Sequence, residues 1–344
     1  MTSVRRSVLA PLGGVAAAGV AGVAYAGLVE RNLFTLRRVA VPVLPEGTRP
    51  LRVLQVSDLH LVPRQERRVA WVRGLAALEP DLVVNTGDNL AAMDAVPAAL
   101  RAMEPLLERP GVFVLGSNDY YAPTLKNPAR YLAPSYRDAP PDRQGLPVGE
   151  LVAGLREGGW VDLDNARTRL DVAGVPLELV GVDDPHIDRD RYAVVSAPAA
   201  DDVALTVGVV HAPYQRVLDA MTADGARLVV AGHTHGGQLA LPALGALVTN
   251  CDLPTDRAKG LSRWWPGAGV GTHSRWVPQR WPRRRGPAGA PRRPAGDAGG
   301  AMSAGAQDAA YLHVSAGLGT SPYAPVRFAC RPEATLLTLV PPGH

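Results

Sequence analysis

Short apolar segments followed by polar residues are the feature that most constrains how this chain can fold. The segments are residues 51–56, 81–85, 111–115, 203–210 and 228–231. Each is a nearly continuous apolar run with polar flanks, which is typical of fully buried strands. Residues 64–78 and 91–107 have helical spacing, although Pro97 and Pro105 limit the second helix. Strands that alternate with helices predict an α/β fold with a layered sheet.

Metal-ligating residue types follow these predicted strands. They are Asp58, His60, Asp88, Asn118, Asp119, His211, His233 and His235. Because the carboxyl ends of strands in an open α/β sheet line one crevice, we expect the side chains to converge. One such residue alone is more often a cap, and Asp88 would fit a helix N-cap. Groups at five strand ends instead favour a metal site. Carboxylate, imidazole and amide ligands suit Mn, Fe or Zn.

Five blocks of the sequence resemble the calcineurin-like metallophosphoesterases. The blocks are Ser57-Asp58-Leu59-His60, Gly87-Asp88-Asn89, Gly116-Ser117-Asn118-Asp119, His211, and Gly232-His233-Thr234-His235-Gly236-Gly237-Gln238. The resemblance covers the chain from residue 50 onward and implies an α/β sandwich of two mixed β-sheets flanked by helices. The subgroup most similar to this chain contains membrane-associated or exported phosphodiesterases, including UDP-2,3-diacylglucosamine hydrolase-like enzymes.

The resemblance implies a role for each strand-end residue. One divalent metal ion would be held by Asp58, His60 and His235, the second by Asn118, His211 and His233, and both by a bridging Asp88. The expected activity is hydrolysis of a phosphodiester, nucleotide-linked or lipid, by a metal-bridging hydroxide. The alternatives are a phosphomonoesterase and a metal-retaining binding protein with little turnover.

The third block departs from the family pattern. Family members have Gly-Asn-His followed by an acid, and that His assists the leaving group, whereas this chain has Ser117-Asn118-Asp119 after Gly116. We prefer Asn118 as the ligand because an amide oxygen coordinates metals better than the Ser117 hydroxyl. An ungapped alignment would put Ser117 at the ligand position, whereas a one-residue shift keeps Asn118 as the ligand and puts Asp119 at the His position. Asp119 is therefore one candidate catalytic residue. His186 is the second, as a proton donor or substrate contact that would compensate for the missing His, and a surface-loop role is the alternative for His186.

A charge-free apolar run at the N-terminus predicts a targeting segment. Residues 8–29 follow Arg5 and Arg6 and are long enough to span a bilayer as a helix. We assign residues 1–30 to a signal anchor or cleaved signal peptide, residues 31–49 to a linker, and residues 50–343 to the catalytic domain. A membrane-associated or exported location follows, with membrane lipid as a partner through this hydrophobic helix.

The net charge of +4 comes from one tract. Residues 263–297 contain eight Arg and a single acid, so the rest of the chain is acidic overall. Residues 266–307, rich in Gly, Pro and Arg, predict a disordered insertion, with contact to anionic lipid as the alternative. Basicity confined to one tract predicts no specific nucleic-acid partner. Cys251 and Cys330 form no CxxC pair and so give no zinc-finger or redox motif.

Overall fold

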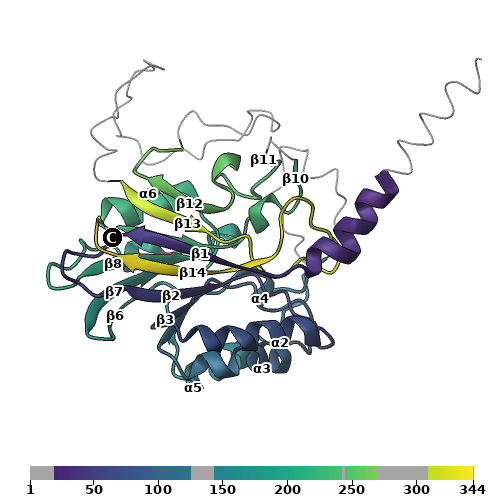
Figure 1. Cartoon of the computed structure of the whole chain (residues 1–344). Helices are drawn as coiled ribbons and strands as arrows, with labels where there is room; N and C mark the ends of the chain where they lie inside the picture. Colours follow the sequence, from purple (N-terminus) through teal and green to yellow (C-terminus); the bar gives the residue numbers. More distant parts are fainter. Residues whose placement is uncertain (1–18, 125–142, 242–244, 270–308, 344) are drawn as a thin grey trace, which may run out of the picture.

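Two six-stranded mixed sheets stacked against each other form the body of the protein (Figure 1). The computed structural model describes residues 19–124, 143–241, 245–269 and 309–343. Helices cover the outer face of each sheet. The predicted α/β sandwich of two mixed sheets flanked by helices is therefore confirmed.

The first sheet has the order β1-β14-β2-β3-β4-β5. Its strands are β1 (Thr35–Pro42), β14 (Glu333–Val340), β2 (Leu51–Val56), β3 (Leu82–Asn85), β4 (Gly111–Phe113) and β5 (Val161–Asp162). Strands β14 and β2 are antiparallel, and the other neighbours are parallel. The parallel run β2-β3-β4 brings three successive strand ends to one edge, where loops can build a site.

The second sheet has the order β12-β13-β9-β8-β7-β6. Its strands are β12 (Gly260–Trp264), β13 (Ala310–Val314), β9 (Leu228–Ala231), β8 (Leu205–Val210), β7 (Val175–Gly181) and β6 (Ala166–Val172). The four central strands are parallel, and the two edge strands pair antiparallel to them. A two-stranded ribbon, β10 (Ala240–Leu241) and β11 (Gly245–Ala246), lies outside both sheets.

Alternation along the strands divides the apolar side chains between layers. In β2, Leu51 and Val53 join the core between the two sheets, whereas Leu54 and Val56 face the helices. The helices over the first sheet are α2 (Glu66–Gly74), α3 (Val96–Leu107) and α5 (Val148–Glu157), and α6 (Gln215–Ala223) packs on the second. Burial of both faces explains why the central strands are apolar almost throughout.

Shorter helical turns sit mostly in the loops. They are η1 (Tyr25–Val29), η2 (Glu30–Asn32), η3 (Leu75–Leu78), α4 (Ser117–Tyr120), η5 (Pro185–Ile187), η6 (Tyr192–Val194), η7 (His235–Gly237) and η8 (Thr255–Arg257). Helix α3 begins at Val96 rather than at residue 91, because Pro97 falls in its first turn, where the missing N–H costs no hydrogen bond.

Two predicted loop and strand assignments differ from the structure. Residues 35–42, placed in the linker from the sequence, form β1, which pairs along its whole length with β14. This strand is partly exposed and carries Arg37 and Arg38, so it lacks the apolar run that marks the others. Residues 327–329, predicted as a strand, contribute an isolated bridge between Phe328 and Leu239.

The N-terminal helical segment, residues 19–32, leaves the sandwich beside the loop that precedes β14 (Figure 1). The carbonyl of Ala26 accepts a hydrogen bond from the Arg327 amide at 3.1 Å. Among the described residues, no helix combines the length and the apolar character needed to cross a membrane. The hydrophobic targeting helix therefore stays a prediction, since residues 1–18 lie outside the described residues. The same holds for most of the predicted insertion, at 270–308.

Candidate metal centre

Loops at the carboxyl ends of the central strands bring the predicted ligands together. Asp58 and His60 follow β2, Asp88 follows β3, Asn118 lies in α4 after β4, His211 follows β8, and His233 and His235 follow β9. Ligand atoms lie within 4.8 Å of one another in two groups, Asp58 with His60 and His235, and Asp58 with Asp88 and His211. The convergence expected from the strand ends is what the fold produces.

Asp88 occupies the middle of the cluster. Its Oδ2 lies 3.5 Å from Nε2 of His60 and 3.5 Å from Nε2 of His211. Beyond these two rings, His60 Nε2 is 3.1 Å from His235 Nε2, and His211 Nε2 is 3.3 Å from His233 Nδ1. One carboxylate therefore faces two separate pairs of imidazoles, which is the arrangement a bridging ligand needs.

Backbone carbonyls orient two of the imidazole rings. His211 Nδ1 lies 2.7 Å from the Thr86 carbonyl, so Nδ1 donates a hydrogen bond to this carbonyl and Nε2 faces Asp88. His233 Nε2 lies 3.2 Å from the Asn250 carbonyl, so this ring presents Nδ1 to the cluster. Each ring thus turns its second nitrogen into the site, and metal ligation would require that nitrogen to be unprotonated.

Burial sets the protonation of the cluster. It lowers the pKa of His60 to about 4 and the pKa of His235 well below its usual value, so both rings are neutral at pH 7. Burial also raises the pKa of Asp58 to about 6. Burial alone would raise the pKa of Asp88 too, but attraction to His211 and His60, together with hydrogen bonds from His211 and Asn118, outweighs it and holds that pKa well below its usual range. Attraction to Asp88 likewise holds the pKa of His211 well above its usual value, and a bound cation would have to displace that proton. Neutral imidazoles beside carboxylates suit a divalent cation.

Backbone strain is concentrated in the same loops. Five predicted ligands have positive φ, namely Asp58 (51°), His60 (42°), Asp88 (56°), His233 (70°) and His235 (50°). Non-glycine residues seldom adopt this left-handed region, and each such residue costs about 1–3 kcal/mol. Strained backbone of this kind persists only where surrounding contacts hold it in place, and it is concentrated at functional sites, where it orients the side chains.

Two glycines let the backbone pass close to the ligands. A Cβ at Gly232 would lie 2.1 Å from Ser57 Oγ and 2.7 Å from Asp58 Oδ2. A Cβ at Gly116 would lie 2.3 Å from Asp88 Oδ1 and 2.7 Å from the His211 ring. Neither position has room for a side chain, which explains why glycine precedes the ligands of two of the sequence blocks.

The two residues of the altered block point in different directions. Asn118 donates to Asp88 Oδ1 through its backbone amide and to Oδ2 through its side chain, both at 2.8 Å. The buried Asp119 carboxylate instead accepts from the backbone amides of Asp88, Asn89 and Gly116 at 2.7–3.0 Å. The structure therefore places Asn118 at the cluster, and it places the Asp119 carboxylate where it holds the β3 and β4 loops together.

The loop after β7 contributes residues at the border of the cluster. The His186 ring lies 4.5 Å from the His233 ring, centroid to centroid, and its Nδ1 is 3.1 Å from the Tyr214 hydroxyl. Asp184 is fully buried, accepts from the His186 amide at 2.8 Å, and has its pKa raised to about 7 by burial. Asp184 and Tyr214 were missed from the sequence, although Asp184 follows a strand just as the predicted ligands do.

Comparison with known proteins agrees with this geometry. Residues 51–237 match the family model of the calcineurin-like phosphoesterases, a span that begins with β2 and ends just after His235. An uncharacterised metallophosphoesterase of Aquifex aeolicus is 29% identical over 247 residues, covering 67% of this chain and 80% of that protein. The phosphodiesterase YaeI of Escherichia coli is 26% identical over 236 residues, covering 65% of this chain and 75% of that protein.

A bovine transmembrane protein with a metallophosphoesterase domain is 26% identical over 207 residues, covering 58% of this chain. The match spans only 44% of the bovine protein. The family model covers more than half of this chain, and the residues it covers include every predicted metal ligand. The chain therefore belongs to the calcineurin-like phosphoesterase family, whose members hydrolyse phosphoester bonds, and it carries a candidate binuclear metal centre.

Proposed function

We propose that this protein hydrolyses a phosphodiester at a two-metal centre. The observation that carries the proposal is the position of Asp88, whose Oδ2 lies 3.5 Å from one imidazole of each predicted ligand group. A single carboxylate between two groups of predicted ligands supports two ions rather than one. The cluster is also buried, which strengthens electrostatic interactions within it.

The residues present fit two divalent cations. Asp58, His60 and His235 would hold one, Asn118, His211 and His233 the second, and Asp88 both. When bound, the cations would supply the Lewis acidity that activates water and neutralises the phosphate oxygens. The chain's own contribution is to hold the ligands, through the positive-φ backbone and through the carbonyls that orient His211 and His233.

Charge around the cluster favours a diester over a monoester. A monoester dianion carries one more negative charge, which usually needs a cationic side chain to bind it. Within the described part of the chain, Arg68 and Arg327 lie beside the predicted ligands, and backbone carbonyls occupy donors of both guanidinium groups. Arg68 donates to the Leu59 carbonyl at 2.7 Å, and Arg327 donates to the carbonyls of Ala316 and Gly319, each at 2.7 Å. The E. coli relative is named a phosphodiesterase, which supports the same substrate class.

Proton donation to the leaving oxygen falls to His186 in this proposal. The Asp119 carboxylate binds three backbone amides and acts as a positioning residue for Asp88. His186 lies against the His233 ring, and the Tyr214 hydroxyl at 3.1 Å fixes its orientation. General acid catalysis by a positioned imidazole contributes typically ~10²–10⁴-fold to a rate.

The N-terminal segment would keep the enzyme at a membrane, as a signal anchor or before cleavage. Support comes from the exposed apolar side chains of Val20 (71%), Val23 (67%) and Leu28 (71%), which gain nothing from contact with water. The bovine relative is named a transmembrane protein. A membrane-associated or exported location would give the enzyme access to lipid-linked phosphodiesters.

The test is a comparison of two chromogenic esters. The full chain in a neutral detergent is assayed on bis(p-nitrophenyl) phosphate and on p-nitrophenyl phosphate while Mn²⁺ is titrated. We expect metal-dependent cleavage with a higher kcat/KM on the diester. A higher kcat/KM on the monoester would replace the proposal with a phosphomonoesterase. Retention of bound metal without turnover of either ester would identify a binding protein.

A further inference from the structure

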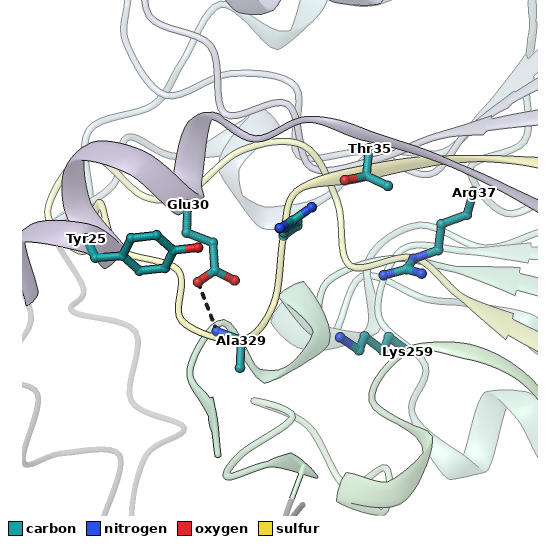
Figure 2. Close-up of a pocket in the computed structure, with 7 residues that line it drawn as sticks. Tyr25, Glu30, Thr35, Arg37, Lys259 and Ala329 are labelled. Carbon is teal, nitrogen blue, oxygen red and sulfur yellow. Dashed lines mark hydrogen bonds between the residues drawn. The ribbon is translucent and has the colours of Figure 1, made fainter. Parts of the chain in front are cut away.

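A pocket separate from the metal cluster lies where the N-terminal helical segment meets β1 and the turn before β14 (Figure 2). Its volume is about 470 Å³. The lining residues are Tyr25, Glu30, Thr35, Arg37, Lys259, Ala329 and Arg331. In Figure 2, Tyr25 approaches from the helical segment, while Arg37 and Lys259 approach from the opposite side. Three segments distant in sequence therefore build one enclosure.

Positive charge predominates in this pocket. Glu30 is its one acidic lining residue, and both carboxylate oxygens already accept backbone amides, from Ala329 at 3.1 Å and from Cys330 at 2.7 Å. Arg37 forms an ion pair with the buried Glu333. Lys259 and Arg331 form no ion pair with any carboxylate that the structure describes. Two cations thus face the pocket without compensation.

The cations and the hydroxyl that line the pocket match a phosphate group. An ammonium and two guanidinium groups offer charge-assisted hydrogen bonds, and guanidinium can bind two phosphate oxygens at once. Tyr25 adds a phenolic hydroxyl on the opposite wall. Repulsion between the cations would be relieved by an anion, whereas a neutral or cationic ligand would leave it in place.

The surroundings of the pocket favour a phosphate that belongs to a lipid. Tyr25 lies in the same helical segment as Val20, Val23 and Leu28, whose side chains are 67–71% exposed. An apolar surface beside a cationic pocket is the pattern of proteins that bind anionic headgroups at a bilayer surface. The pocket is also adjacent to the metal cluster, because Cys330 Sγ lies 3.8 Å from Lys259 Nζ and 3.2 Å from the His235 carbonyl.

We propose that this pocket is a binding site for the phosphate of an anionic headgroup, distinct from the metal centre. Bound there, a headgroup would fix the helical segment against β1 and hold the metal cluster at a set distance from the bilayer surface. The site requires no catalysis, so it stands or falls independently of the proposed phosphodiesterase activity.

Calorimetric titration of the metal-free full chain in neutral detergent tests the proposal. A chelator removes metal, so the metal centre cannot capture phosphate. The ligands are dihexanoyl phosphatidic acid, inorganic phosphate and dihexanoyl phosphatidylcholine. The variants are Lys259→Gln and Arg331→Gln, which break no ion pair among the described residues, and the control is Arg38→Gln, which removes a charge from the other side of β1. Arg37 is left intact because its loss would strand the buried Glu333.

We expect phosphatidic acid to bind, phosphatidylcholine to bind much more weakly, and each pocket variant to raise the dissociation constant for phosphatidic acid about tenfold. Arg38→Gln should leave it unchanged. Equal binding of inorganic phosphate, with the same loss in the variants, would retain the site and assign it to free phosphate. If Arg331→Gln and Lys259→Gln bind phosphatidic acid as the control does, or if no anion binds at all, the proposal is wrong.

Discussion

The metal cluster and the cationic pocket lie on either side of Cys330, yet they are built in opposite ways. In the cluster, five of the seven predicted ligands are buried, two imidazoles have lowered pKa values, and five residues adopt strained backbone. In the pocket, the cationic side chains of Arg37, Lys259 and Arg331 are exposed, and these residues lie on ordinary backbone. A largely buried site with strained backbone and an exposed cationic site thus lie next to each other, with Cys330 between them.

The difference shows what each kind of ligand demands. A metal ion needs several lone pairs fixed within a few ångströms, so the fold holds the ligand side chains on strained backbone and away from water. A phosphate group on a flexible lipid tolerates looser geometry, and mobile cationic side chains at a surface suffice. Substitutions at the cluster should therefore have large effects on metal binding or activity, and substitutions on the pocket side should have smaller effects.

Asp88→Asn should have the largest effect. The amide is neutral and lacks the negative charge that would let Oδ2 hold two cations, so kcat/KM should fall about a thousandfold with loss of bound metal. Activity on bis(p-nitrophenyl) phosphate and metal content measure the change. Asp94→Asn, the same substitution at an exposed position, is the control. A variant that keeps its activity and two bound ions would show that Asp88 does not bridge the two ligand groups.

His186→Ala should lower kcat about a hundredfold while bound metal stays the same, because the variant loses a proton donor and no ligand. The loss should be larger for a phenyl diester than for a p-nitrophenyl diester, since phenoxide is the poorer leaving group. Tyr214→Phe, which removes only the hydroxyl at 3.1 Å, should cause a smaller loss. Equal losses on both diesters would show that His186 does not donate the proton.

Gly232→Ala should weaken metal binding by roughly 10–100-fold, because the new methyl group would displace Asp58 and Ser57. Equilibrium dialysis against Mn²⁺ measures the affinity. Gly74→Ala is a matched control, since nothing lies within 4 Å of a Cβ there and alanine favours a helix. Unchanged affinity in Gly232→Ala would mean that the cluster tolerates more movement than its packing indicates.

Glu30→Gln should have the smallest effect, on the pocket side. It converts charge-assisted hydrogen bonds to Ala329 and Cys330 into neutral ones, which costs about 1 kcal/mol. Hydrogen exchange at these two amides should become about fivefold faster, with metal content unaffected. Glu46→Gln, at an exposed position, should change neither. Loss of metal in Glu30→Gln would show that the two regions are not independent.

Much of the cluster could be predicted because its signals are local. Strands buried on both faces appear in the sequence as continuous apolar runs. Predicted ligands at the carboxyl ends of these strands follow the runs directly or within two residues, as Asp58 and His211 do. The fold class followed from that pattern together with the family resemblance, and so did the set of seven predicted ligands that the fold brings together.

Other features were decided by the tertiary structure, because they depend on partners distant in sequence. Residues 35–42 read as a linker and become a strand because β14, about three hundred residues later, offers an edge to pair with. The backbone amides of Asp88 and Asn89 that donate to Asp119 come from the loop after another strand, so the positioning role proposed for this carboxylate depends on the packed fold. The cationic pocket combines residues 25–37, 259 and 329–331, which no spacing in the sequence relates. Periodicity and motifs record which face of an element is buried, whereas only the packed fold determines which elements meet.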